Sequence, residues 1–322
     1  MPPVTLIIPT VHHRAALYAR ALRYLEASGF RGPVVVSDHS AAEHRSVVED
    51  LSRKHQRLDL TLLRHPPEAH FLERLTLCAQ AARTPYVHLH ADDDFLSLAV
   101  LERLVERMEQ GSAAAMGLNV HAEFASRQLS VLAKTAAPST DAFERLMAQL
   151  ESFSSVLYAL RRREELISTF AFALERCPDV QFWQYLESCV AALQGPIAVV
   201  DELHYVRGLH EAKWSSTLVR QRSPDHFPYL ILSPEFQPRL AAFRSALIQA
   251  AEARRVAVDR ERLDAGLIHL LYRGLGAMGL PARHSRPNPA GFDAKAAFER
   301  KVSDPQHPMT RELERIFALA GE

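Results

Sequence analysis

Short apolar runs alternate with amphipathic segments over the first 90 residues of the chain. The apolar runs are rich in β-branched residues, which is typical of strands that are buried on both faces of a sheet. The segments between them carry apolar residues at helical spacing, for example Leu17, Ala21, Leu22 and Leu25. The pattern predicts strands at residues 4–10, 34–40, 58–63 and 86–90, and helices at residues 15–28, 41–54 and 68–83.

Strands that alternate with helices favour right-handed crossovers and an open parallel sheet with helices on both faces. In such a sheet, ligands bind beyond the carboxyl ends of the strands. Three of the predicted strands end in or lead into Pro9-Thr10, Ser37-Asp38 and Asp92-Asp93-Asp94. We therefore expect these residues to lie along one edge of the sheet, although they are far apart in the sequence.

The pattern changes at residue 215. Before it, further helices are predicted at 98–110, 140–150, 163–174 and 178–186, and further strands at 113–120, 128–133, 154–160 and 197–200. After it, helices are predicted at 236–255, 260–275 and 310–319, with a connector rich in Pro and Gly at 276–292. We expect an α/β domain over residues 1–215 and a mainly helical C-terminal extension over residues 216–322.

The fourth predicted strand leads into three adjacent carboxylates, Asp92, Asp93 and Asp94. Adjacent carboxylates repel one another, and hard cations such as Mg2+ or Mn2+ relieve that repulsion while leaving coordination positions for substrate phosphates. The three residues therefore favour a site for a metal ion and a diphosphate. The alternative is a solvated loop or a helix N-terminus, where Asp is also common.

The composition is that of an ordinary soluble protein. Lys plus Arg and Asp plus Glu both total 38, and no long basic block could follow a nucleic-acid backbone, so nucleic acid is not an expected partner. The three widely spaced cysteines form no CxxC pair, which favours a reducing compartment. The N-terminal residues lack the pattern of a signal peptide, and no apolar stretch is long enough to cross a bilayer. We expect a cytoplasmic protein, and peripheral membrane contact stays open.

Four short motifs occur in an order that resembles one enzyme family. They are Ile7–Thr10, Val35–Ser40, Leu89–Asp94 and Pro178–Trp183. Together they resemble the family 2 glycosyltransferases over about the first two thirds of the chain. The resemblance implies the GT-A fold, a Rossmann-like, mostly parallel sheet with helices on both faces. It also implies a metal-dependent enzyme that moves a sugar from a nucleotide-diphosphate donor to an acceptor hydroxyl, with inversion at the anomeric carbon.

The first two motifs correspond to nucleotide-binding residues of that family. The resemblance places Pro9 and Thr10 along the nucleotide, and it places Asp38 where the family's Asp-Asp-Gly-Ser-like turn accepts a hydrogen bond from the base. This chain departs from that turn at Ser37 and His39.

The third motif resembles the family's Asp-x-Asp metal motif, in which one carboxylate lies near the ribose and another binds the metal ion. One alignment puts His90 where the family often has Asp, and another takes Asp92, Asp93 and Asp94 as the motif. The resemblance implies Mn2+ or Mg2+ as cofactor, with Asp92 and Asp93 also contacting the donor. Which of the three carboxylates binds the metal stays open.

The fourth motif carries the candidate general base. In the family an acidic pair before an aromatic helix supplies the base, and here Asp179 occupies the second position while Pro178 replaces the first. A carboxylate base must lie within hydrogen-bond reach of the acceptor hydroxyl. The alternative is that Asp179 is an ordinary helix N-cap.

A polar run follows the last predicted strand and resembles the family's closing segment. Arg207, His210 or Lys213 would bind the diphosphate, because cationic groups stabilise a departing nucleotide. The alternative is that these side chains simply lie in solvent, as charged residues usually do.

The sequence leaves the partner and the activity partly open. The acceptor hydroxyl belongs to a glycan, a lipid-linked sugar or a protein, and the helical extension is a candidate surface for homodimerisation. The departures at Ser37, His90 and Pro178 motivate an alternative, a catalytically silent GT-A-like protein that binds a nucleotide sugar or a protein partner. A nucleotidyltransferase is disfavoured because the chain lacks a Gly-rich opening after the first strand.

Overall fold

The computed structural model describes residues 3–66, 68–132, 136–179, 181–208, 230–276 and 294–320. Its strands form one mixed sheet in the order β3-β2-β1-β4-β8-β6-β9-β5, with β7 paired to β6. Among these strands, β1, β2, β3, β4, β6 and β9 run in one direction and β5, β7 and β8 in the other. The predicted α/β class with a mostly parallel sheet is therefore confirmed. The strands are β1 Val4–Thr10, β2 Pro33–Asp38, β3 Asp59–Arg64, β4 Tyr86–Leu89, β5 Asp94–Leu96, β6 Ala114–Glu123, β7 Gln128–Leu132, β8 Leu160–Arg162 and β9 Ile197–Gly208.

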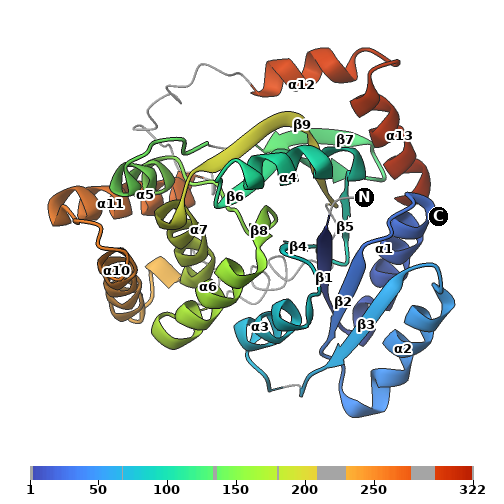
Figure 1. Ribbon diagram of the computed structural model, residues 1–322, viewed down its shortest axis with the longest axis horizontal. Helices are drawn as coiled ribbons and strands as arrows, with labels where there is room; N and C mark the ends of the chain where they lie inside the picture. Colours follow the sequence, from blue (N-terminus) through green and yellow to red (C-terminus); the bar gives the residue numbers. More distant parts are fainter. Residues whose placement is uncertain are drawn as a thin grey trace.

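Helices cover both faces of this sheet (Figure 1). One apolar core lies against α3, α5, α6, α7, α10 and α11, and a second core lies against α1, α4 and α13. None of the described helices is long and apolar enough to cross a membrane. The α-helices are α1 Ala15–Ala27, α2 Arg45–Lys54, α3 Phe71–Ala81, α4 Leu101–Glu109, α5 Ala142–Glu151, α6 Arg163–Arg176, α7 Phe182–Gln194, α10 Phe236–Glu252, α11 Arg260–Gly276, α12 Ala294–Val302 and α13 Pro308–Ala320, and the short 3-10 helices are η1 His12–Arg14, η2 Ala42–His44 and η3 Leu98–Val100.

The two cores follow from the alternation of side chains along the central strands. Ile7 and Val35 belong to the first core, whereas Leu6, Ile8 and Val36 belong to the second. Successive side chains of a strand point to opposite faces of the sheet. A strand that is apolar at every position is therefore stable only where helices cover both faces, as they do here.

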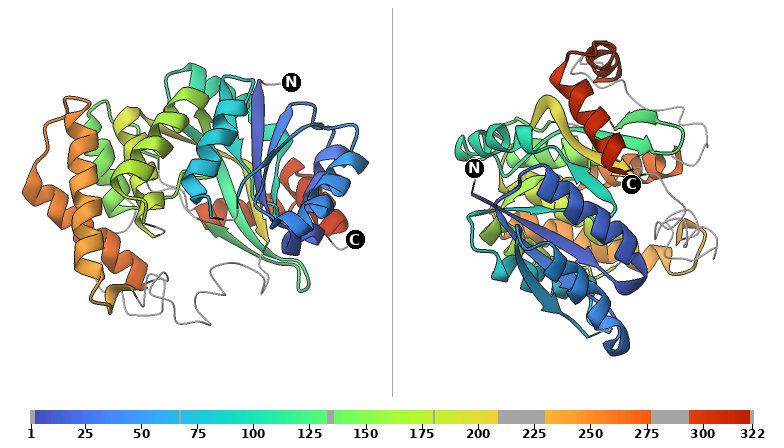
Figure 2. Two further views of the ribbon diagram at one scale, coloured as in Figure 1. Left: turned by 90° about the horizontal axis from the view of Figure 1, so that it is seen from below. Right: turned by 90° about the vertical axis from the view of Figure 1, so that its right-hand side faces the viewer.

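The C-terminal helices form two groups. Helices α10 and α11 pack against α7 and α5, while α13 packs against α1 and α12 against β7. Figure 1 shows the two groups at opposite sides of the molecule, and the left view in Figure 2 shows the same separation. The predicted boundary at residue 215 and most of the predicted connector at 276–292 lie outside the described residues. The division into two domains therefore stays a prediction.

The predicted strand at residues 154–160 is wrong. Residues 153–156 form a loop, and β8 begins only at Leu160. The apolar run is buried in another way: Val156 is buried, and its N–H donates to Oγ of Ser188 in α7 at 3.2 Å. The backbone N–H of Val156 is therefore hydrogen-bonded to a side chain of a helix, whereas in a strand it would be hydrogen-bonded to a neighbouring strand. The sequence pattern also fails to predict β5 and α12, which are short.

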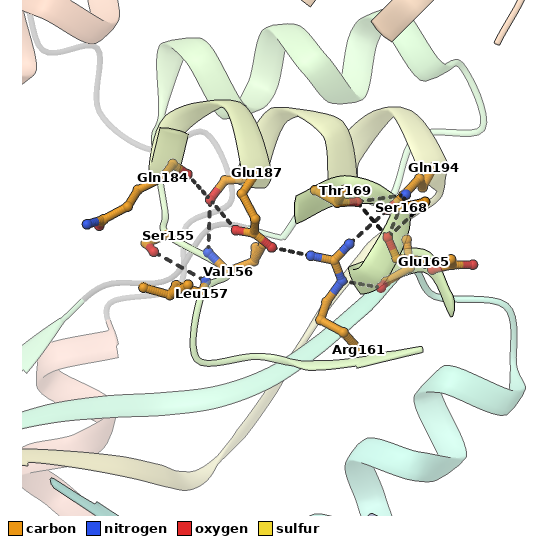
Figure 3. Close-up of polar contacts among 12 residues, drawn as sticks. Ser155, Val156, Leu157, Arg161, Glu165, Ser168, Thr169, Gln184, Glu187 and Gln194 are labelled. Carbon is orange, nitrogen blue, oxygen red and sulfur yellow. Dashed lines mark hydrogen bonds and ion pairs between the residues drawn. The ribbon is translucent and has the colours of Figure 1, made fainter. Parts of the chain in front are cut away.

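A buried ion pair fixes β8 between its neighbours. The guanidinium of Arg161 pairs with the carboxylate of Glu187 in α7, and both side chains are buried. Arg161 also donates from Nε to the carbonyl oxygen of Ala113 at 3.0 Å and from Nη2 to Gln194 at 2.8 Å. Figure 3 shows Arg161 reaching from β8 toward Glu187 and Gln194 of α7. Burial raises the pKa of Glu187, and the charge of Arg161 opposes that rise.

Breaking this pair should destabilise the fold. We expect Glu187→Gln to lower the free energy of unfolding by about 3–5 kcal/mol, because Arg161 would stay buried without a compensating charge. Urea denaturation measures the change. Glu164→Gln is the matched control, because Glu164 is 74% exposed and pairs with the adjacent Arg163; its expected effect is below about 0.5 kcal/mol. Equal losses in the two variants would contradict a structural role for the buried pair.

Candidate functional site

The ends of β1, β2 and β4 meet at one edge of the sheet. Thr10 and Asp38 are paired in register between β1 and β2. Across β1, the N–H of His90 donates to the carbonyl oxygen of Ile7 at 2.8 Å, and Oγ1 of Thr10 donates to Oδ2 of Asp92 at 2.8 Å. The structure therefore brings together the residues that the sequence pattern assigned to this edge, including Pro9, which immediately precedes Thr10.

The acidic corner, defined as Asp92, Asp93 and Asp94, is buried. Arg14, at the end of η1, holds two of its carboxylates. Nη2 of Arg14 lies 2.6 Å from Oδ1 of Asp92 and 3.1 Å from Oδ2 of Asp93. Nε of Arg14 donates to Oδ1 and Oδ2 of Asp92 at 2.9 and 3.0 Å. Burial raises the pKa of Asp92, and the hydrogen bonds and charge of Arg14 act against that rise.

Asp94 is held by the last residues of β9. Oδ1 of Asp94 accepts a hydrogen bond from the N–H of Gly208 at 3.1 Å, and Oδ2 lies 3.7 Å from Nε of Arg207. The guanidinium of Arg207 also lies over the ring of Tyr158, 5.2 Å from its centre. Arg207 is therefore at the acidic corner, where a diphosphate-binding cation was predicted. His210 and Lys213 lie outside the described residues.

Arg20 adds a further cation at this edge. Its Nη2 donates to the carbonyl oxygen of Asp93 at 3.1 Å, and its guanidinium lies 5.2 Å from the ring centres of both Phe95 and Phe124. No sequence motif distinguishes Arg14 or Arg20 from the other arginines near the start of the chain. Only their contacts with residues more than 70 positions away reveal their role.

Asp38 has one carboxylate oxygen without a partner. Oδ1 accepts a hydrogen bond from the N–H of Ser40 at 2.9 Å. Oδ2 is buried and has no hydrogen-bond partner among the described residues, and Asp38 is 1% exposed. The rings of His12 and His44 stack nearby with their centres 4.1 Å apart. The backbone N–H of His12 donates to Oγ of Ser40. A buried carboxylate oxygen without a partner is costly, and a ligand N–H donor would satisfy it.

A buried group of polar rings lies beneath the acidic corner. The Nε2 atoms of His88 and His204 are 3.0 Å apart, and the hydroxyl of Tyr205 accepts a hydrogen bond from the N–H of Ala91 at 2.8 Å. Both ring nitrogens of His90 are buried without a hydrogen-bond partner among the described residues. Burial lowers the pKa of His88 well below its ordinary value and that of His90 to about 4. His88 and His90 are therefore neutral at pH 7.

The acidic corner provides oxygen atoms of the kind that bind a metal ion. In the present arrangement, however, other side chains already contact these oxygens. Carboxylate oxygens are the ligands that Mg2+ and Mn2+ prefer. Here, however, Arg14 and Thr10 already contact both oxygens of Asp92. Across the described ranges, no three His, Cys, Asp or Glu side chains are grouped so that they could hold a metal ion. A metal ion would fit at Asp92 only after Arg14 had moved away.

Asp179 lies among a different set of contacts. Its Oδ1 accepts hydrogen bonds from the N–H groups of Gln181 and Phe182, both at 2.8 Å, so Asp179 caps the first turn of α7. Its Oδ2 forms an ion pair with Arg239 of α10. The carbonyl oxygen of the preceding Pro178 lies 3.1 Å from Nε2 of His70. The capping role that the sequence left as an alternative is therefore observed, and the role as a general base stays a prediction.

Comparisons with known proteins give structural likenesses only. No protein-family model matches the chain. No curated protein matches it either. The chain is similar to the crystal structure of residues 1–349 of S. aureus TarS, with a TM-score of 0.48, 14% identity, and coverage of 86% of this chain and 92% of that one.

Two further solved structures have comparable likeness. The structure of S. aureus TarS 1–349 with UDP-GlcNAc has a TM-score of 0.48 and 13% identity over 86% of this chain and 92% of that one. The mannosyltransferase PcManGT from Pyrobaculum calidifontis, in complex with GDP-Man and Mn2+, has a TM-score of 0.44 and 17% identity over 99% of this chain and 86% of that one. Likenesses of this size carry no argument about the reaction of this chain.

The neutral histidines should make the protein sensitive to acid. The pKa of His90 is about 4 in the fold against 6.5 ordinarily, so the unfolded chain takes up the proton first and stability is lost as the pH falls through that window. We expect the free energy of unfolding to decrease as the pH falls from 6.5 to about 4. His90→Leu should reduce the slope of unfolding free energy against pH by up to about 1.4 kcal/mol per pH unit. Urea denaturation at a series of pH values measures the slope. An identical slope in the variant would rule out His90 as a source.

Proposed function

We propose that the chain transfers a sugar from a nucleotide-diphosphate donor to an acceptor hydroxyl at the edge formed by β1, β2 and β4. The observation that carries the proposal is the buried Oδ2 of Asp38, which has no hydrogen-bond partner among the described residues. Asp38 lies in register beside Thr10, and Thr10 is hydrogen-bonded to Asp92. A nucleobase N–H directed at Asp38 would place the ribose and diphosphate along Thr10 toward the acidic corner.

The diphosphate in this proposal is bound by cations at the corner. The Arg207 side chain is 33% exposed, so it can reach a ligand from its position beside Asp94. Guanidinium groups bind phosphate oxygens through two parallel hydrogen bonds, and they stabilise the charge that develops on a leaving diphosphate. His210 remains a proposed further contact to the diphosphate.

Mn2+ or Mg2+ is the proposed cofactor, and Asp92, Asp93 and Asp94 are the residues that would hold it. A bound divalent cation would supply positive charge to the departing diphosphate. The protein's own residues determine whether the ion can enter, because Arg14 contacts Asp92 and Asp93.

The proposed general base is Asp179. It would accept the proton of the acceptor hydroxyl as the acceptor oxygen bonds to the anomeric carbon and the bond from that carbon to the diphosphate breaks, with inversion. Arg239 and the first turn of α7 hold the carboxylate in one orientation. The proposed acceptor is a glycan, a lipid-linked sugar or a protein.

The same contacts of Asp179 favour a second candidate function. A carboxylate that caps a helix and pairs with an arginine is already fully used for structure. In the alternative, the chain is a catalytically silent protein that binds a nucleotide sugar or a partner at this edge. Slow hydrolysis of the donor in the absence of an acceptor separates the two, because a protein that only binds the donor would not hydrolyse it.

Asp38→Asn should weaken nucleotide binding. We expect about a tenfold loss of affinity for the nucleoside diphosphate that the wild type binds best, because Asn offers a neutral acceptor in place of a charged one. A thermal-shift panel of nucleoside diphosphates with and without Mn2+ identifies that ligand, and calorimetry measures the affinity. Asp50→Asn is the control, because Asp50 is 59% exposed on α2. Equal affinity of wild type and Asp38→Asn would refute the assigned base contact.

Asp179→Asn should distinguish a base from a cap. Asn retains an oxygen that can cap α7 but loses the charge that pairs with Arg239, so we expect stability to fall by about 1–3 kcal/mol. If Asp179 accepts the proton, kcat should fall by about a hundredfold or more, with KM for the donor little changed. Steady-state kinetics and urea denaturation on the same preparations give both values. A stability loss with unchanged kcat would leave Asp179 as a cap only.

A further inference from the structure

We infer that Arg14 takes the place of a divalent cation at the acidic corner, so that a metal ion binds there only when Arg14 has moved away. The inference rests on the proposed function only in treating the corner as the donor's diphosphate site. Its physical basis is the set of contacts between one guanidinium and two buried carboxylates.

The contacts of Arg14 occupy the oxygens that a metal ion would need. Three distances of 3.0 Å or less join the guanidinium to the two oxygens of Asp92, and a fourth of 3.1 Å joins it to Asp93. The planar fork of Arg matches a carboxylate in this way, whereas Lys offers a single point charge. Mg2+ binds carboxylate oxygens at about 2.0–2.1 Å, so a metal ion at Asp92 would occupy the space of the guanidinium nitrogens.

The positive charge of Arg14 also disfavours a metal ion at the acidic corner. Asp92 and Asp93 are buried, and Arg14 compensates their charge in place of an ion. A divalent cation beside Arg14 would bring two positive groups together in a poorly solvated place, which costs free energy. The Arg14 side chain is 18% exposed and belongs to the short η1 turn, so it borders solvent.

The exchange predicts a gain of metal binding when Arg14 is removed. We expect Arg14→Gln to bind Mn2+ at least about tenfold more tightly than the wild type, because the oxygens of Asp92 become accessible. The assay is titration with Mn2+ alone, without nucleotide, followed by the electron paramagnetic resonance of free Mn2+. Adding Asp92→Asn to Arg14→Gln should abolish the gain. Arg53→Gln, which removes an exposed arginine that pairs with Glu49 and Asp50, should bind Mn2+ as the wild type does.

A second variant covers the case in which Arg14→Gln does not fold, which circular dichroism would show. Arg14→Lys keeps the charge but loses the fork, and we expect an Mn2+ affinity at least about threefold above that of the wild type. Equal Mn2+ affinities for the wild type and the folded variants, whether tight or absent, would overturn the inference. Because no nucleotide is present, this result is independent of whether the chain binds a nucleotide sugar.

Discussion

The ion pair between Arg14 and Asp92 is the interaction on which the candidate site depends. Three consecutive carboxylates are buried at the end of β4, and unpaired buried charges cost several kcal/mol each. Arg14 makes this burial tolerable, and Thr10 supplies a further hydrogen bond to the same carboxylate. The pair also ties the turn after β1 to the segment that follows β4.

The other side of the corner depends on a change of register in β9. This strand pairs first with β6 and then, at Tyr205 to Arg207, also with β5, and the pairing with β6 shifts between Met116 and Asn119. Gly117 lies within the shift, where a Cβ would come within 2.4 Å of the carbonyl oxygen of Glu202. The close approach of the two backbones therefore requires glycine. The shifted strand carries Arg207 and Gly208 to the carboxylate of Asp94.

The sequence was sufficient for those features that depend on local pattern. Continuous apolar runs predicted β1, β2 and β4, and the rule for strand ends placed Thr10, Asp38 and Asp92 at one edge. Features that depend on residues far away in the sequence could not be predicted from local pattern. The sequence around Arg14 does not indicate its partner Asp92, which follows β4 and comes close only in the fold. The apolar run at 154–160 is held by a hydrogen bond to a side chain of α7 and does not form a strand. Strand β5 has three residues, too few for a periodic pattern to be recognised.

The position of Asp179 gives the C-terminal helices a role that the family resemblance does not cover. Its partner Arg239 belongs to α10, which packs against α7, so the candidate base is oriented from the last third of the chain. Three of the candidate carboxylates are thus paired with arginines: Asp92 with Arg14, Asp94 with Arg207 and Asp179 with Arg239. An arginine in such a pair competes with a metal ion or a substrate hydroxyl for the carboxylate oxygens. The arginine partners therefore have to be considered together with the carboxylates in any test of metal binding or of proton transfer.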